Sequence, residues 1–296
     1  MKTLETQSPK YLEIIEEYRK NGKAIAHFNI SNLDQARAIV EVAQELNQPI
    51  IIGVSEGERA YMGVPMVRKI VDELNQEYDV PVFLNADHTY SFEKVKEVVE
   101  AGYDSVIIDG AKLPYEENVA LVKQCVDFVR EYEEKTGKRV LTEAELGYIG
   151  QSSSLNESLP EGVSEANITT KEQAKDFVLR TGVDMFAPAI GNVHGMLIDV
   201  PEPKLHTDRL KEISDELNMP LVLHGASGNT DEDLVASVKN GITIVHVNTE
   251  IRKAFRDGEK EYMEEHPNEV APYKFGKEGQ EKMKKVVKAK IELYIK

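Results

Sequence analysis

The chain has 296 residues, of which 36 are Lys or Arg and 52 are Asp or Glu, so its formal net charge is −16. With 41% hydrophobic residues and one cysteine, the composition excludes collagen-like, disordered and disulfide-stabilised proteins. The negative charge and the lack of a dense Lys/Arg run exclude nucleic acid and membranes as expected partners. The N-terminus has no apolar signal segment, which predicts a cytoplasmic protein.

Short β-branched runs alternate with longer segments of helical period, after an N-terminal amphipathic helix predicted in residues 1–22. The runs are almost continuously apolar, which is typical of parallel strands covered by helices. Eight such units favour an α/β fold, a (β/α)8 TIM barrel over about 24–250, with C-terminal helices over about 251–296 in one domain, 1–296. The predicted strands cover residues 24–30, 49–55, 80–87, 104–110, 139–147, 183–191, 220–227 and 242–248.

The main alternative fold is a doubly wound dinucleotide-binding domain. Such a domain has a Gly-rich turn after its first strand and an acidic residue about twenty positions later. The first predicted strand instead ends in AHFNISNLDQ, and none of the GK pairs lies in a Walker A loop. Nucleotide binding is therefore not expected.

The connection at residues 150–169 is long, Ser-rich and poor in apolar residues. Connections in this fold are usually short, and long loops near the mouth of a barrel often cover its site. We therefore expect residues 150–169 to form a mobile lid.

Polar side chains gather at the carboxyl ends of the predicted strands, where barrel enzymes carry their active sites. Among them, His88, His194 and His224 come from three different strands and have Gly or other small residues nearby. Any one of them alone would more often be a structural histidine. Three histidines with an open fourth position, however, form the ligand arrangement of a catalytic zinc. The polar residues at the strand ends are Asn29, Asp87, His88, Asp109, Glu143, Glu145, His194, His224, His246 and Asn248.

Three carboxylates accompany these histidines. Asp87 precedes His88, and at a strand terminus both side chains can face the mouth. Asp87 is therefore a candidate general acid or base, with a helix N-cap or turn residue as the alternative. Glu143 and Glu145 share one face of the fifth strand, where buried carboxylates need hydrogen bonds or a metal. We expect one of the two to orient a ligand or bind a cation.

Turns rich in small residues follow the last three predicted strands: GNVHG, HGASGN and NTE. Main-chain N–H groups at such turns and at helix N-termini bind anions, and this position is the usual phosphate site of the fold. Ser227 and Thr249 add hydroxyl groups. The three turns together predict a phosphate-binding site.

In this order, the motifs resemble those of the class II, metal-dependent fructose-bisphosphate aldolases, over nearly the whole chain. The matching segments are NADH (85–88), DGAKLPYEEN (109–118), EAELG (143–147), AIGNVHG (189–195), EPKLHTDRLKEI (202–213), HGASG (224–228) and VNTE (247–250).

The resemblance implies that His88, His194 and His224 bind a catalytic Zn²⁺, with Glu145 as a further or alternate metal residue. It implies that Asp87 handles the proton of the C4 hydroxyl as the carbon–carbon bond breaks. Sugar phosphates would be the substrates, a monovalent cation (Na⁺ or K⁺) would lie nearby, and the protein would form a homodimer or homotetramer. The implied substrate and phosphate residues are Asn29, Gly195, Gly225, Ser227, Asn248 and Thr249, and the implied supporting or alternate metal residues are Asp109 and Glu143.

Two histidines depart from the family pattern. His246 stands where the family usually has an Asn that contacts the enediolate; it can still donate a hydrogen bond, so we place it with Asp87 among the catalytic residues. His27 lies in a stretch that more often reads AFN. Both side chains would point inward from neighbouring strands of a closed barrel. We therefore hypothesise that His27 and His246 touch and that the two substitutions are linked.

The loop also departs from the pattern, because it lacks the acidic GGEED-like run that supplies a Glu for proton exchange at dihydroxyacetone phosphate. Glu157, Glu161 and Glu165 lie within the loop and are the candidates to replace it. The alternative is that each is simply solvated at the surface.

These expectations combine into a zinc-dependent aldolase of glycolysis and gluconeogenesis that cleaves fructose 1,6-bisphosphate to dihydroxyacetone phosphate and glyceraldehyde 3-phosphate. Tagatose 1,6-bisphosphate, which differs in configuration at one hydroxyl, is the alternative substrate. A second alternative is a barrel that keeps the metal site but has become a binding or regulatory protein. A metal-dependent hydrolase is a third alternative, although it would leave the phosphate turns unexplained.

Overall fold

The computed structural model describes residues 8–150, 153–164 and 168–296. At its centre, eight parallel strands of the described chain close into a barrel in the order β1-β10-β9-β7-β5-β4-β3-β2. Each strand overlaps one of the predicted strands, so the predicted (β/α)8 TIM barrel is confirmed. The strands are β1 Ile25–Asn29, β2 Ile50–Val54, β3 Val82–Thr89, β4 Ser105–Ile108, β5 Leu141–Leu146, β7 Met185–Pro188, β9 Leu221–Leu223 and β10 Ile242–Val247.

Helices surround the strands, and several begin at short polar side chains that cap the first turn. Asn32, Ser55 and Thr230 each accept a hydrogen bond from a main-chain N–H three residues later. The helices are α1 Ser8–Lys20, α2 Leu33–Leu46, α3 Glu56–Met62, α4 Val64–Glu77, α5 Phe92–Glu100, α6 Tyr115–Thr136, α7 Lys171–Thr181, α8 Thr207–Leu217, α9 Asp231–Lys239, α10 Thr249–Glu265 and α11 Pro272–Tyr294.

The end of the barrel at which the strands begin is closed by α1, which lies within the amphipathic helix predicted in residues 1–22. Tyr11 and Ile15 are almost completely buried, and the Tyr11 ring stacks on Phe83 of β3 with centroids 4.2 Å apart. These side chains join an apolar cluster inside the strands. The interior of the barrel near the starts of the strands is therefore filled. A site can form only at the opposite end, where the carboxyl ends of the strands lie.

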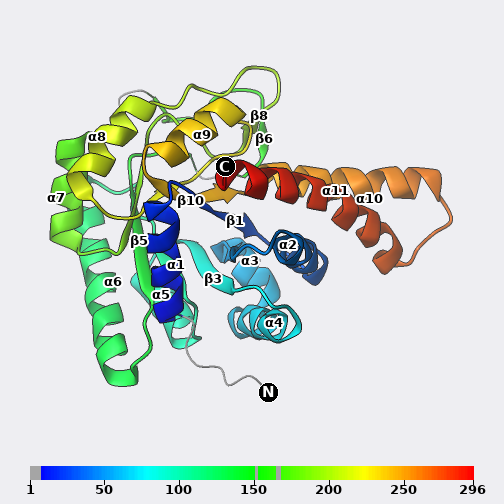
Figure 1. Cartoon of the computed structure of the whole chain (residues 1–296), viewed down its shortest axis with the longest axis horizontal. Coiled ribbons are helices and arrows are strands. Elements are labelled where there is room, and N and C mark those ends of the chain that lie inside the picture. Colours follow the sequence, from blue (N-terminus) through cyan, green and yellow to red (C-terminus); the bar gives the residue numbers. More distant parts are fainter. Residues whose placement is uncertain (1–7, 151–152, 165–167) are drawn as a thin grey trace.

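The C-terminal helices α10 and α11 pack on each other and extend away from the barrel (Figure 1). Gly258 and Gly279 lie at their contact, where a Cβ on either residue would crowd the main chain of the other helix. The helix α11 also packs against α2. This arrangement confirms the predicted helical C-terminal extension.

Some elements were not predicted from the sequence. The helices α3 and α4 follow β2, and a small two-stranded sheet pairs β6 (Leu155–Asn156) with β8 (Met196–Leu197). This sheet ties the predicted lid to the chain beyond His194, while 151–152 and 165–167 of the lid lie outside the described residues. In the described ranges, no helix is long and apolar enough to cross a membrane.

Candidate active site

A cavity opens at the carboxyl ends of the barrel strands, and its wall contains most of the predicted site residues. Asp109, Glu143 and Glu145 are also brought to this end, where they are buried beside the histidines. The wall is formed by Asn29, Ser55, Asp87, His88, Tyr90, Ser153, His194, Gly195, His224, Gly225, Ser227, His246, Asn248, Thr249 and Arg252.

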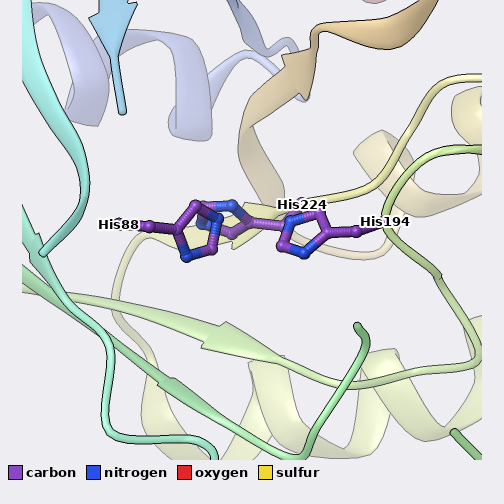
Figure 2. A group of neighbouring side chains, drawn as sticks. All are labelled: His88, His194 and His224. Atoms are coloured by element: carbon purple, nitrogen blue, oxygen red, sulfur yellow. The ribbon is translucent and has the colours of Figure 1, made fainter. Parts of the chain in front are cut away.

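The imidazole rings of His88, His194 and His224 converge above the barrel (Figure 2). Their centroids lie 4.7 Å apart for His88 and His194, 4.8 Å for His88 and His224, and 6.0 Å for His194 and His224. Each ring can offer one nitrogen, and these three atoms lie within 4.8 Å of one another. The structure therefore brings together the three predicted ligands of a metal ion.

One nitrogen of each ring is already held by the protein. His88 Nδ1 lies 2.8 Å from Asp109 Oδ2, and His224 Nε2 lies 2.7 Å from Glu143 Oε1. His194 Nδ1 lies 2.8 Å from the main-chain oxygen of residue 150. Metal-binding histidines usually donate their second N–H in this way, which fixes the tautomer and the ring orientation. The remaining nitrogens, Nε2 of His88 and His194 and Nδ1 of His224, form a donor set that fits zinc.

The charges around these rings also fit a cation. Burial alone would lower the pKa of His88, but the negative charge of Asp87 and the hydrogen bond and negative charge of Asp109 outweigh it and raise the pKa to about 10. Burial and the neighbouring positive charge of His88 lower the pKa of His194 to about 4. The surrounding carboxylates therefore hold a positive charge at this point, which is the role that a metal ion would fill.

Asp87 lies beside the three histidines, as its position before His88 predicted. Its Oδ2 accepts a hydrogen bond from Asn29 Nδ2 at 2.8 Å, and its Oδ1 lies 3.7 Å from His88 Nε2 and 3.5 Å from His246 Nδ1. Burial would raise the pKa of Asp87, but the positive charges of His88 and His246 hold it well below its usual range. Asp87 is therefore ionised and can accept a proton at Oδ1.

Glu143 and Glu145 point to the same side of β5, as their two-residue spacing predicted, and both are almost fully buried. Burial and the negative charges of nearby carboxylates raise their pKa values well above the ordinary range. Glu143 orients His224, whereas Glu145 Oε2 lies 4.0 Å from His88 Nδ1. With His88 and Asp109, Glu145 forms a second group that could hold a metal ion.

The predicted phosphate turns meet at one side of the cavity. Gly225 has φ +63°, and a Cβ on this residue would overlap the main-chain oxygen of Val193. This position therefore requires glycine, which lets the turn after β9 pack against the segment that carries His194. Ser227 Oγ accepts a hydrogen bond from Glu250 N at 3.3 Å, which joins this turn to the start of α10 at Thr249.

The predicted contact between His27 and His246 is confirmed. The two residues are register partners on the neighbouring strands β1 and β10, and their rings stack with centroids 3.4 Å apart and planes at 11°. His27 Nε2 lies 3.1 Å from Asn85 Oδ1. A Cβ on Gly53, the register partner of Asn85, would overlap Cε1 and Nε2 of the same ring. The absence of a side chain at Gly53 therefore makes room for His27 beneath His246.

We expect Gly53→Ala to destabilise the protein by about 1–3 kcal/mol, because the added methyl group overpacks a closed lumen. The free energy of unfolding in urea would measure this. Gly57→Ala is the matched control, since no atom lies within 4 Å of the Cβ that it would add. A second change, His27→Ala, should restore much of the loss. Equal stabilities of the Gly53→Ala and Gly57→Ala proteins would contradict this packing.

Comparison with known proteins identifies the family. The chain matches the model of the fructose-bisphosphate aldolase class-II family over residues 9–295. The chain belongs to this family. It is 38% identical over 270 residues to the D-tagatose-1,6-bisphosphate aldolase subunit GatY of Klebsiella oxytoca, with 91% of each sequence covered.

Solved structures agree with the class II aldolase family. The YdjI aldolase of Escherichia coli K12 matches with a TM-score of 0.79 and 28% identity, over 96% of each chain. A proposed fructose-1,6-bisphosphate aldolase of Coccidioides immitis matches with a TM-score of 0.81 and 26% identity, over 97% of this chain and 96% of the other. The predicted resemblance is therefore confirmed.

In this class II aldolase family member, sequence reasoning missed three charged residues at the site. Glu58 of α3 is buried and accepts hydrogen bonds from Asn29 Nδ2 at 2.9 Å and Ser55 N at 2.7 Å. It also pairs with Arg252, which lines the cavity. Arg59, next to Glu58, lies under the end of β3. The capping box that joins Ser55 and Glu58 was the available sequence signal.

Of the three glutamates expected in the lid, the two that the structure describes do not line the cavity. Glu157 and Glu161 are exposed, and Glu165 lies outside the described residues. Ser153 lines the cavity instead and accepts a hydrogen bond from Asn248 Nδ2 at 3.2 Å. The suggested role of Glu157, Glu161 or Glu165 in proton exchange stays a prediction.

Proposed function

We propose that the chain is a zinc-dependent aldolase that reversibly cleaves fructose 1,6-bisphosphate to dihydroxyacetone phosphate and glyceraldehyde 3-phosphate. The observation that carries this proposal is the convergence of three histidine nitrogens beside an ionised carboxylate, Asp87. A hydrolase would need the metal to activate water. The phosphate turns in the same cavity wall support a sugar phosphate instead, as does membership of a ketose-bisphosphate aldolase family.

Each residue has a role in this proposal. His88, His194 and His224 would hold zinc, which would supply Lewis-acid polarisation of the ketone. Asp87 Oδ1 takes the proton of the C4 hydroxyl as the bond between C3 and C4 breaks. Asn29 keeps Oδ2 occupied, so that Oδ1 remains the basic oxygen.

Other residues bind the substrate. The C1 phosphate would be held by main-chain N–H groups of Gly195, Gly225 and Thr249 and by the Ser227 hydroxyl. A monovalent cation, Na⁺ or K⁺, beside this phosphate is also part of the proposal. Arg252 brings a guanidinium to the cavity wall and is our choice for the second phosphate. His246 would donate a hydrogen bond to the enediolate, and Asn248 would contact the substrate. Glu145 would be an alternate metal ligand, and Asp109 and Glu143 would orient the histidine ligands.

Tagatose 1,6-bisphosphate is the second candidate substrate. The 38% identity to a tagatose-1,6-bisphosphate aldolase subunit favours it, whereas the C. immitis structure favours fructose 1,6-bisphosphate. Discrimination between these sugars depends on one hydroxyl configuration.

A homodimer or homotetramer is also proposed, and a cytoplasmic location stays a prediction of the sequence.

A coupled assay tests the function. Zinc-loaded protein, protein stripped by a chelator and protein reloaded with zinc would each be given fructose 1,6-bisphosphate and tagatose 1,6-bisphosphate. We expect turnover that is lost on stripping and restored on reloading, with a higher kcat/KM for the fructose sugar. A higher kcat/KM for the tagatose sugar would reverse the assignment. Bound zinc without turnover of either sugar would support a binding or regulatory barrel.

A further inference from the structure

The guanidinium of Arg59 is buried beneath the end of β3, with 3% of the residue exposed. It donates hydrogen bonds to the main-chain oxygens of Val54, of Asp87 at 3.0 Å and of His88 at 3.4 Å, and to Thr89 Oγ1 at 3.1 Å. Among the described residues, its hydrogen bonds thus go to main-chain oxygens and one hydroxyl rather than to a carboxylate. An arginine used in this way organises the main chain.

The main chain that Arg59 holds is unusual. His88 has φ +41°, in the left-handed region that residues with a side chain rarely adopt. The register between β3 and β4 also shifts between Ala86 and Thr89. Such conformations persist only where the surroundings hold them. Arg59 bonds the carbonyl groups of residues 87, 88 and the side chain of 89, which are the residues at this bend.

The bend has a consequence for the site. Neighbouring side chains on a regular strand point to opposite faces. Asp87 and His88 instead both reach the same cavity, with Asp87 Oδ1 3.7 Å from His88 Nε2. His88 is a metal ligand and Asp87 the base in the proposed function. Their shared orientation therefore depends on the bend that Arg59 holds.

Arg59 is itself held in place by its helix. The capping box of Ser55 and Glu58 fixes the start of α3 directly before Arg59. Glu58 also reaches Asn29, which donates to Asp87 Oδ2. The short helix α3 therefore supports Asp87 in two ways. Glu58 holds Asn29, which donates to the Asp87 side chain, and Arg59 donates to the Asp87 carbonyl group.

We propose that Arg59 is a positioning residue of the metal site, whose guanidinium stabilises the left-handed bend at His88 and so directs Asp87 and His88 into one cavity. A lysine cannot replace it fully, because a single ammonium group does not reach several separated oxygens with the planar geometry of a guanidinium. This inference rests on the zinc site of the proposed function, and its catalytic part rests also on the proposed aldolase reaction.

The test measures zinc affinity in the absence of substrate, by competition with a chromophoric chelator, per folded molecule. We expect Arg59→Met to lower this affinity by about 10–100-fold, as for other residues that orient metal ligands, and Arg59→Lys to give an intermediate loss. Arg68→Met is the matched control. Its guanidinium donates to the Gly102 carbonyl and pairs with Asp104, outside the cavity wall, and these contacts involve none of the residues 87–89 at the bend.

The outcomes separate positioning from general stability. Arg68→Met should lower the melting temperature but leave zinc affinity unchanged. Wild-type zinc affinity in folded Arg59→Met would overturn the proposal, and if that variant does not fold, wild-type affinity in Arg59→Lys would do so. If the wild type turns over a sugar, kcat of the Arg59 variants should fall more than KM rises. If it turns over none, the zinc measurement still decides the role of Arg59.

Discussion

Asp87→Asn should lower kcat for the preferred sugar bisphosphate by about 100- to 10,000-fold, the usual contribution of a general acid or base. The amide has nearly the same shape as the carboxylate and can still accept the hydrogen bond from Asn29, but it cannot take a proton. Zinc content and KM should change little, because the histidine ligands and the phosphate turns are unaltered. Steady-state kinetics on zinc-loaded protein would measure the effect.

A second buried carboxylate provides the control for Asp87→Asn. Asp104 pairs with Arg68 and accepts a hydrogen bond from Leu84 N, outside the cavity wall. Asp104→Asn should therefore reduce stability while leaving kcat of the folded enzyme near the wild-type value. Turnover by Asp87→Asn close to the wild-type rate would show that another group takes the proton.

His224→Ala should have the largest effect on metal binding. It removes one of three nitrogens from a site in which the other two cannot complete a tetrahedral set. Glu143→Gln removes only the carboxylate that orients His224, and we expect a loss of about 10–100-fold in zinc affinity. His206→Ala, at an exposed histidine outside the cavity wall, should change nothing.

Thermal unfolding measures the same ranking without substrate. A ligand at 100 times its dissociation constant stabilises the folded state by about 2.7 kcal/mol. Added zinc should therefore raise the melting temperature of the wild type and of His206→Ala, raise that of Glu143→Gln less at the same concentration, and leave His224→Ala nearly unchanged. An equal rise in all four proteins would mean that zinc binds elsewhere.

The barrel could be predicted because its signal is local and repeated. Each apolar run followed by a helical segment indicates one unit, and the closed order of the strands follows from eight such units. The same topology places strand ends together, which is why the sequence alone assigns His88, His194 and His224 to one site. The His27–His246 contact was predictable for the same reason, because β1 and β10 must be neighbours in a closed barrel.

The charged support of the site was less accessible to sequence reasoning. Glu58 and Arg59 are charged residues, which usually lie at the surface. Only the packing of α3 against the end of β3 shows that both are buried. Arg252 likewise lies one turn into α10, beyond the end of β10 where a barrel usually carries its site residues. The pairing of β6 with β8 could not be foreseen either, because two-residue strands leave no periodic pattern.

The distribution of the three proposed metal ligands along the chain would link zinc binding to the order of folding. His88 follows β3, His194 follows β7 and His224 follows β9, while the barrel closes only when β1 pairs with β10 near residue 247. A ribosome must therefore complete most of the polypeptide before the three nitrogens can meet. Zinc bound at this site can then serve as a reporter of the finished barrel, and its release should accompany the opening of the seam between the first and last strands.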